Sequence, residues 1–236
     1  MLQAFLQGAF ELVFPDNCLL CRQFLNSRHQ RQLCTTCLGT LALNPIPFSR
    51  LKGTVPLSNR EQSPSSSFAF DQAWSACLYN EPAQKLLHAF KYNSKTSLSK
   101  TFVPLMIDFI DRHHIPLQKF DLISPIPLHP VRLRERGYNQ SSLLSLGLSR
   151  HYGILHTESL LIRQKMTTTQ TELGAKQRWT NMEGAFRIKN PTDVKDKTIV
   201  LIDDLYTTGA TLNAAAEVLK IAGATRVCVL TLSITI

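Results

Sequence analysis

A continuous apolar run that ends in two adjacent carboxylates limits the fold of this 236-residue chain more than any other feature. Residues 198–203 read Thr-Ile-Val-Leu-Ile-Asp, Asp204 follows, and a short loop leads into a helical pattern at 209–222. A run that is apolar at nearly every position is typical of a strand buried on both faces of a parallel sheet. Open sheets of this kind bind ligands at the carboxyl ends of their strands, which is where the two carboxylates fall.

Strands and helices alternate along the sequence from about residue 71 onward. The pattern predicts further strands at 73–79, 121–127 and 226–232 and further helices at 82–92, 101–113 and 141–150. Strands separated by helices of this length form βαβ units. We therefore expect an α/β domain with a mainly parallel sheet over residues 71–236, and the 44% of hydrophobic residues can supply its core.

The loop after the carboxylates has the composition of a phosphate cradle. Its threonines offer hydroxyls, its glycine lets the backbone come close, and the free N–H groups at the start of the helix attract anions. Carboxylates repel a phosphate, so their partners must be the hydroxyls of a sugar, with Mg²⁺ nearby. The pattern predicts a site for a 5-phosphorylated ribose. The residues assigned to it are Asp203, Asp204, Thr207, Thr208, Gly209, Ala210 and Thr211.

Four of the six cysteines form two Cys-x2-Cys pairs near the start of the chain. Two such pairs supply the four thiolates that Zn²⁺ prefers, and a site filled by protein ligands is structural rather than catalytic. Disulfides are the alternative, but nothing in the sequence indicates export, and reducing cytosol disfavours them. We expect a zinc finger over residues 16–44. Its ligands would be Cys18, Cys21, Cys34 and Cys37.

The segments on either side of this finger are an expected helix and an expected linker. Residues 1–15 have apolar side chains at helical spacing and no basic start, which predicts a short amphipathic helix rather than a signal peptide or a membrane span. Its polar face has no basic residues, which favours packing on the protein over the alternative of docking on a membrane. Residues 45–70 are rich in proline and serine and read as a linker. We expect a cytoplasmic protein.

Positive charge is in excess and is unevenly placed. The chain has 26 Lys and Arg against 17 Asp and Glu, and residues 17–60 contain basic residues but no acidic one. This balance favours a polyanionic partner, although a basic housekeeping enzyme is the plainer alternative.

Basic residues also gather in two loops of the predicted α/β domain. The three arginines at 132–136 suit a pyrophosphate or a nucleic acid backbone, unless the loop is merely a solvated one. Lys91 ends a predicted helix, where it could equally serve to stabilise the helix dipole. The candidate contacts with pyrophosphate or nucleic acid are Lys91, Arg132, Arg134, Arg136, Tyr138, Asn139, Gln140, Arg163, Lys165 and Arg178.

The segment IVLIDDLYTTGATL at 199–212 resembles the 5-phosphoribosyl-1-pyrophosphate (PRPP) motif of type I phosphoribosyltransferases. Three further segments are LLHAFKYNSK at 86–95, SPIPLHPVRLRERGYNQ at 124–140 and LIRQKMTTTQTELGAKQRWTNMEGAF at 161–186. Together with the four-cysteine module, they resemble the ComF family of bacterial competence proteins over nearly the whole chain. Many relatives carry a further cysteine cluster, but residues 44–68 contain no cysteine, so we expect one metal site.

The resemblance implies a type I phosphoribosyltransferase-like sheet flanked by helices, with a small N-terminal zinc finger. It implies PRPP with Mg²⁺ as the ligand, Asp203 and Asp204 as the catalytic pair if turnover occurs, and residues 132–140 as the pyrophosphate loop. Residues 163–181 would be the mobile loop that closes over PRPP, the alternative being a disordered connector.

The resemblance also implies a role in DNA uptake during natural transformation. The protein would handle incoming single-stranded DNA beside an uptake helicase and a membrane channel, and so be held at the inner face of the membrane by its partners. An active Mg²⁺-dependent phosphoribosyltransferase with an unidentified acceptor is the alternative. A PRPP-sensing regulator of transcription is weaker, because the sequence has no helix-turn-helix pattern.

Overall fold

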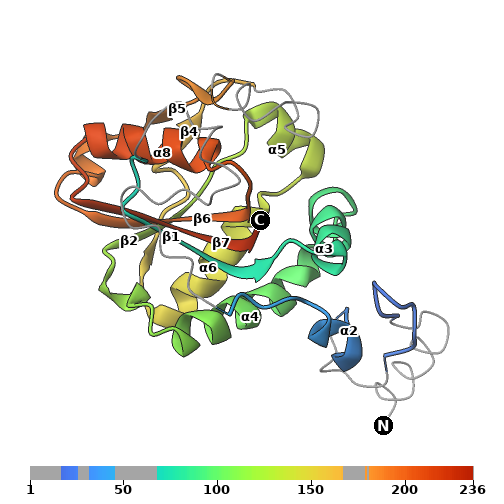
Figure 1. The fold of residues 1–236 in the computed structure, drawn as a ribbon. Helices are drawn as coiled ribbons and strands as arrows, with labels where there is room; N and C mark the ends of the chain where they lie inside the picture. The colour runs from blue at the N-terminus through green and yellow to red at the C-terminus, as the bar shows by residue number, and fades with distance from the viewer. Residues whose placement is uncertain (1–16, 26–31, 46–67, 167–178, 180, 236) are drawn as a thin grey trace, which may run out of the picture.

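The computed structural model describes residues 17–25, 32–45, 68–166, 179 and 181–235 (Figure 1). The predicted helix at 1–15, Arg178 and most of the predicted linker at 45–70 lie outside the described residues. Within the described part of the chain, no helix is long and apolar enough to cross a membrane.

Five parallel strands form the central sheet, in the order β1-β7-β6-β2-β3. They are β1 (Gln72–Leu78), β2 (Leu122–Pro125), β3 (Leu155–His156), β6 (Thr198–Tyr206) and β7 (Arg226–Ile234). The longest ladder joins β6 to β7, and Asp203 lies opposite Thr231 in it. The mainly parallel sheet that the sequence predicts is therefore confirmed.

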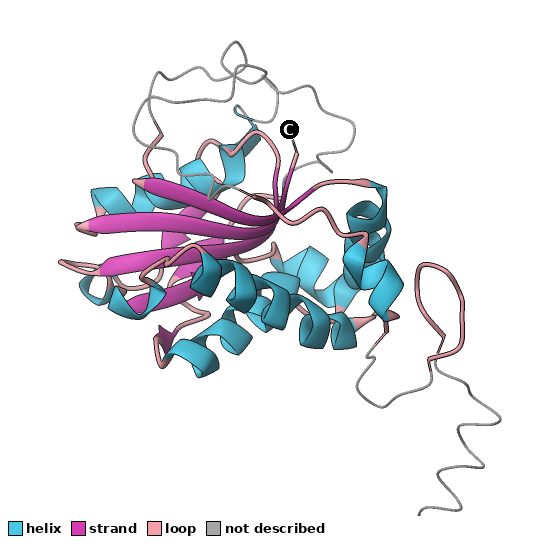
Figure 2. Cartoon of the chain, turned by 60° about the horizontal axis from the view of Figure 1, so that its bottom comes forward, coloured by secondary structure: helices cyan, strands magenta, loops and turns pink. Residues whose placement is uncertain are grey.

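Helices cover both faces of this sheet (Figure 2). The long helices are α3 (Glu81–Tyr92), α4 (Ser99–Arg112), α6 (Gln140–Tyr152) and α8 (Ala210–Ile221). Val200 and Ile202 of β6 are buried in one hydrophobic cluster with α3, α4 and α6, whereas Ile199 and Leu201 are buried in another with α8. Because both faces are covered, the strand is apolar at successive positions.

Smaller elements complete the fold. They are α2 (Thr35–Gly39), α5 (Pro130–Arg136), the antiparallel hairpin of β4 (Leu161–Arg163) and β5 (Phe186–Ile188), and the 3-10 turns η2 (Thr96–Leu98), η3 (Leu117–Lys119) and η4 (Pro191–Asp193). In Figure 1 the hairpin and α5 lie on the same side of the sheet as α8. The cysteine module, with α2, lies beside α3.

Three predicted strands differ in length from the observed ones, and one of them, predicted at 226–232, extends to Ile234 as β7. The predicted strand at 121–127 is shorter in the structure, ending at Pro125, because Pro127 has no N–H to donate to the ladder. The predicted strand at 198–203 is longer, extending to Tyr206, because Leu205 and Tyr206 stay in register with β7. The acidic pair therefore belongs to the strand itself rather than to the loop that follows.

Candidate functional site: a basic cleft around an acidic pair

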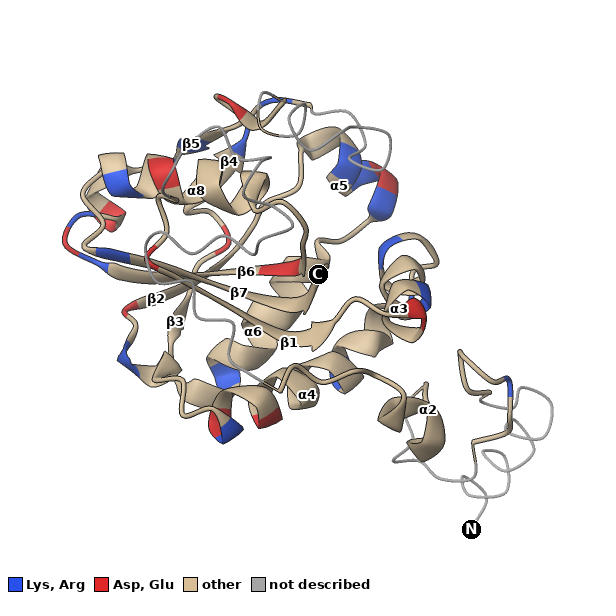
Figure 3. Cartoon of the chain, viewed as in Figure 1, with Lys and Arg blue, Asp and Glu red and all other residues tan. Residues whose placement is uncertain are grey.

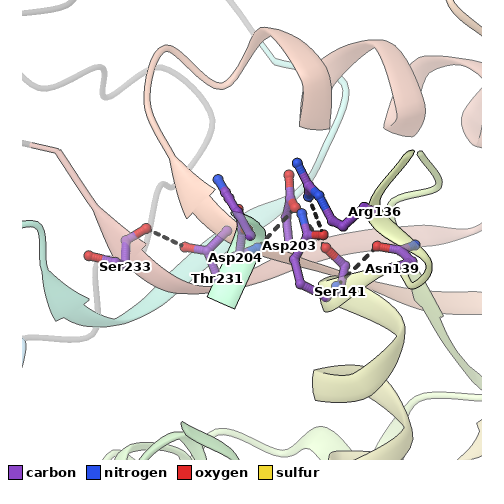
Figure 4. Close-up of polar contacts among 9 residues, drawn as sticks. Arg136, Asn139, Ser141, Asp203, Asp204, Thr231 and Ser233 are labelled. Atoms are coloured by element: carbon purple, nitrogen blue, oxygen red, sulfur yellow. Dashed lines mark hydrogen bonds and ion pairs between the residues drawn. The ribbon is translucent and has the colours of Figure 1, made fainter. Parts of the chain in front are cut away.

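The acidic pair lies at the carboxyl edge of the sheet, near the end of β6 (Figure 4). Asp203 Oδ1 accepts hydrogen bonds from Ser141 Oγ and from the backbone N–H of Asp204, each at 2.9 Å. Asp204 Oδ1 forms an ion pair with Lys91 Nζ at 2.9 Å. Asp204 Oδ2 is buried and has no hydrogen-bond partner among the described residues. One carboxylate oxygen in the site thus has unused capacity to accept a hydrogen bond.

Lys91 interacts with both carboxylates, and its positive charge opposes the effect of burial on the pKa of Asp203. Burial raises the pKa of Asp203 to about 6, and the charge of Asp204 raises it too, whereas Lys91 acts in the opposite direction. For Lys91, burial lowers the pKa, but the ion pair with Asp204 and the charge of Asp203 outweigh burial and raise it. Lys91 therefore stays charged at neutral pH.

A cleft of about 440 Å³ opens over this pair. Four cationic side chains among the described residues line it, from α3, α5 and β4, and the phosphate loop, residues 207–211, forms another part of its wall. The predicted site residues that line it are Lys91, Arg132, Arg136, Gln140, Arg163, Asp203, Asp204, Thr207, Gly209, Ala210 and Thr211. In Figure 3 the basic residues of α5 and α3 lie around the acidic residues of β6. Segments far apart in the sequence thus meet in one site suited to an anion.

The phosphate loop depends on a glycine. Gly209 has a φ of +80°, and a Cβ placed there would lie 2.5 Å from Tyr206 Oη and 2.9 Å from a ring carbon of Phe68. Thr208 Oγ1 accepts a hydrogen bond from Ala210 N at 3.4 Å, so this hydroxyl holds the start of α8. The geometry brings the backbone close to whatever the cleft binds.

The three arginines at 132–136 lie on helix α5 rather than in the loop that the sequence predicted, and only two of them line the cleft. Arg136 donates to Gln140 Oε1 at 2.5 Å, and its guanidinium carbon lies 5.3 Å from the centre of the Tyr92 ring. Arg132 lines the cleft and pairs with Glu135 at 3.2 Å. Arg134 is exposed and is not among the residues that line the cleft.

Two other predicted residues of this loop have structural roles. Tyr138 donates its hydroxyl to Phe90 O, which ties the loop to α3. Asn139 caps α6 by accepting from Ser141 N at 3.1 Å, and its amide donates to Ile126 O at 3.0 Å. Neither lines the cleft, so their interactions explain the loop's shape rather than its contacts with a ligand.

The predicted site residues in the segment at 163–181 also differ in whether they line the cleft. Arg163 lines the cleft, and its guanidinium carbon lies 5.7 Å from the Phe186 ring. Lys165 instead donates to Glu183 O at 3.3 Å and does not line the cleft. The prediction of a closing loop at 163–181 falls mainly on residues 167–178, which lie outside the described residues.

Sequence reasoning missed several residues of the site. Ser141 was not singled out, although it holds Asp203, because only the packing of α6 against β6 brings the two together. Further cleft residues were not assigned to the site; they are Tyr79, Tyr92, Ile126, Leu128, His129, Met166, Leu205, Leu212 and Thr235. Most are ordinary apolar or aromatic residues, and no local pattern marks them as lining a cleft.

The four cysteines of the N-terminal module gather at one point. The sulfur atoms of Cys18, Cys21, Cys34 and Cys37 all lie within 4.8 Å of one another, and none of the six cysteines forms a disulfide. Burial raises the pKa of the Cys18 thiol, but hydrogen bonds from the backbone, chiefly of Cys21 and Cys34, outweigh burial and lower it to about 6. The donor set and its spacing fit a metal ion such as zinc.

Comparison with a protein-family model agrees with this architecture. The phosphoribosyl transferase domain matches residues 159–233, from just before β4 through the acidic pair and the phosphate loop into β7. The chain therefore contains a domain of the phosphoribosyltransferase class, as the α/β fold and its sheet also indicate.

Similar proteins show which family within this class the chain belongs to. DNA utilization protein YhgH of Salmonella typhimurium is 30% identical over 232 residues, which cover 92% of this chain and 96% of that protein. Competence protein F of Haemophilus influenzae is 34% identical over 60% of this chain and 63% of its own length. Competence protein ComFC of Bacillus subtilis is 31% identical over 65% of this chain and 60% of its own length. The chain belongs to the ComF family of competence proteins.

Proposed function

We propose that this protein binds PRPP in the basic cleft and serves DNA uptake by handling incoming single-stranded DNA. The observation that carries the proposal is the meeting of an acidic pair, a glycine-dependent phosphate loop and four cationic side chains in one cleft of about 440 Å³. The acidic and basic groups suit the two parts of one ligand: sugar hydroxyls for the carboxylates, and phosphate groups for the cations and the backbone N–H groups.

Each group has a distinct task in this proposal. The 5-phosphate would lie on residues 207–211, and the pyrophosphate would face Lys91, Arg132 and Arg136. Asp203 and Asp204 would accept hydrogen bonds from the ribose, which would give the buried Asp204 Oδ2 a partner that the described residues do not supply. Mg²⁺ would be held beside these carboxylates, and when bound it would neutralise charge on the pyrophosphate.

The DNA part of the proposal rests on charge and on the relatives. Two relatives are named competence proteins and a third a DNA utilization protein. The chain has a net charge of +9, and its basic residues include those of the cysteine module and of α5. Phosphate contacts from these side chains would hold single-stranded DNA without regard to its sequence. Zinc at the four cysteines would be structural.

Active Mg²⁺-dependent phosphoribosyl transfer to an acceptor is the second candidate. The observation that favours it is the placement of cations from three elements, α3, α5 and β4, around the acidic pair. A leaving pyrophosphate would develop its negative charge among these side chains, and such preorganised charge is a large part of enzymatic rate enhancement. Release of pyrophosphate from PRPP, with a panel of acceptors, separates this candidate from a binding protein.

The proposal is tested by thermal and chemical unfolding with and without Mg²⁺ and PRPP. At a ligand concentration of about 100 times the dissociation constant, the native state should gain about 2.7 kcal/mol. The double variant Asp203→Asn/Asp204→Asn should lose this gain, because amides do not replace the carboxylates toward the sugar and Mg²⁺.

The control changes two exposed carboxylates outside the cleft. Asp108→Asn/Asp196→Asn removes the same charge from α4 and from the turn before β6, where Asp196 has a positive φ that asparagine also tolerates. The gain should persist in this control. No gain in the wild-type protein with its metal in place would refute PRPP binding.

A further inference from the structure

Helix α3 contacts both the cysteine module and the cleft, at opposite ends. Its N-terminal end begins after Asn80, and its C-terminal turn carries Phe90, Lys91 and Tyr92. Between these ends Leu86 is buried in the hydrophobic cluster that α3 forms with α4 and α6, and this cluster also contains residues of the cysteine module. In Figure 1 the helix lies between α2 and the carboxyl edge of the sheet.

The side-chain oxygen and nitrogen of Asn80 form hydrogen bonds with different parts of the chain. Its Oδ1 accepts from Ala83 N at 3.1 Å and so caps α3, while its Nδ2 donates to Thr40 O at 2.9 Å. Thr40 follows α2 directly, and both its backbone N–H and its hydroxyl donate to Cys37 O, at 3.2 and 2.7 Å. Hydrogen bonds through Thr40 therefore connect Asn80, the N-cap of α3, to Cys37 of the cysteine cluster.

The strand before α3 makes a second connection to the module. Leu78 N donates to Ala42 O at 2.8 Å, and Asn44 N donates to Ala76 O at 2.9 Å. The module's last described residues thus add a short antiparallel pairing to β1, which is an edge strand of the sheet. Since β1 leads directly into Asn80, a shift of the module would displace the start of α3.

The other end of α3 contacts the groups of the cleft. Lys91 forms the ion pair with Asp204, Phe90 O accepts the hydroxyl of Tyr138, and the Tyr92 ring faces the guanidinium of Arg136. A docked α3 therefore places Lys91 on the cleft wall. If α3 moved away, the cleft would lose this cation, and Asp204 would lose its ion-pair partner.

We propose that Asn80 is a positioning residue through which metal binding at the four cysteines and anion binding in the cleft strengthen each other. Both ligands favour the docked position of α3: the metal by fixing the module that holds Asn80, and the anion by its contact with Lys91. Linkage requires the effect to be equal in both directions. This inference rests on the proposed function for its cleft ligand.

The test measures zinc release from the zinc-loaded full-length protein to a zinc-selective chromogenic chelator, with and without saturating Mg²⁺ and PRPP. At an unchanged rate of zinc association, an equilibrium coupling at the lower end of the usual range should slow release from the wild-type protein about fivefold. In Asn80→Asp the carboxylate still caps α3 but cannot donate to Thr40 O, so the slowing should fall below twofold. Asn80→Ser, which also keeps a capping oxygen, repeats the test if Asn80→Asp folds poorly.

Two controls separate positioning from simple destabilisation. Asn190→Asp changes a matching asparagine cap at η4, far from the module in sequence, and should leave the slowing unchanged. Lys91→Gln should speed zinc release even without PRPP, because it removes the contact between α3 and Asp204, whereas Lys85→Gln on the same helix breaks only an exposed pair with Glu81 and should not.

The outcomes distinguish this inference from the proposed function. PRPP that stabilises the protein but leaves zinc release unchanged overturns the inference alone, as does full slowing in Asn80→Asp. If PRPP does not bind, the proposed function fails, and the Lys91→Gln arm decides the inference: faster release supports the connection through α3, and unchanged release overturns it.

Discussion

Asp203 and Asp204 are adjacent in sequence but differ in their surroundings. Asp203 accepts two hydrogen bonds, from Ser141 and from the backbone, whereas Asp204 is held by Lys91 and keeps one buried oxygen without a partner among the described residues. The partners come from different helices, α6 for Asp203 and α3 for Asp204. The pair therefore offers two non-equivalent contacts to a ligand.

Asp203 gives the site a dependence on pH. Its native pKa, raised by burial to about 6, exceeds its ordinary value of about 4, so the native state binds more protons than the unfolded state between these pH values. Asp203 should therefore lower the free energy of unfolding as pH rises from about 4 to about 6. Urea unfolding across this range should show Asp203→Asn gaining stability relative to the wild type until about pH 6 and not beyond.

The same titration should act on the ligand. Mg²⁺ and PRPP should bind more tightly to the wild-type protein as pH rises through about 6, because only the ionised carboxylate accepts hydrogen bonds freely. If the free energy of unfolding of Asp203→Asn relative to the wild type stayed constant from about pH 4 to about pH 6, the raised pKa of Asp203 would be contradicted.

At the scale of elements, the turn between β6 and α8 is the most constrained part of the site. Gly209 is the N-cap of α8 and has a left-handed backbone, so the chain reverses there without a side chain. The aromatic rings of Phe68 and Tyr206 occupy the space that a side chain would need. Phe68 in turn packs on Trp179, with ring centres 5.5 Å apart, next to the segment at 167–178.

Gly209→Ala should therefore damage both stability and binding. A non-glycine residue at this φ costs about 1–3 kcal/mol, and the contact with Tyr206 adds to that cost. Urea unfolding should show a loss of about 2 kcal/mol or more, and stabilisation by Mg²⁺ and PRPP should disappear. Gly39→Ala is the matched control: a Cβ there meets nothing within 4 Å, and alanine favours helix, so stability should be unchanged or slightly higher.

At the scale of the whole molecule, basic side chains lie at both edges of the sheet, but the acidic pair of β6 lies at the carboxyl edge. At the carboxyl edge, Arg132 and Arg136 of α5 line the cleft together with Lys91, Arg163 and the acidic pair. The amino edge carries exposed lysines before β2 and β6, among them Lys119 and Lys197. A polyanion that is also bound by the cysteine module would meet the first edge, since α3 and the module lie on that side.

Binding of single-stranded DNA should therefore depend steeply on salt and on α5. Each phosphate contact with a single strand contributes about 0.7 to the slope of log affinity against log salt concentration. The variant Arg132→Gln/Arg134→Gln/Arg136→Gln should reduce this slope by about 2, measured by fluorescence anisotropy with a labelled oligonucleotide. The variant Lys119→Gln/Lys195→Gln/Lys197→Gln removes the same charge from the amino edge and should leave the slope unchanged. Equal effects of both variants would refute a defined DNA surface.

The sequence by itself determined the features that depend on local patterns. The apolar run before Asp203 predicts a doubly covered strand, the spacing of the four cysteines predicts their cluster, and the alternation of strands and helices predicts the parallel sheet. The structure agrees on each of these points. Strand β3 and the hairpin of β4 and β5 were not predicted, because elements of two or three residues are too short to show periodicity.

Only the tertiary structure decided which polar residues belong to the site. Arg132 and Arg134 are alike in sequence, but the helical turn of α5 directs one toward the cleft and leaves the other exposed. Ser141 reaches Asp203, and Asn80 joins α3 to the cysteine module, across 62 and 40 positions of sequence. Such contacts arise from the packing of distant elements, which no local pattern encodes.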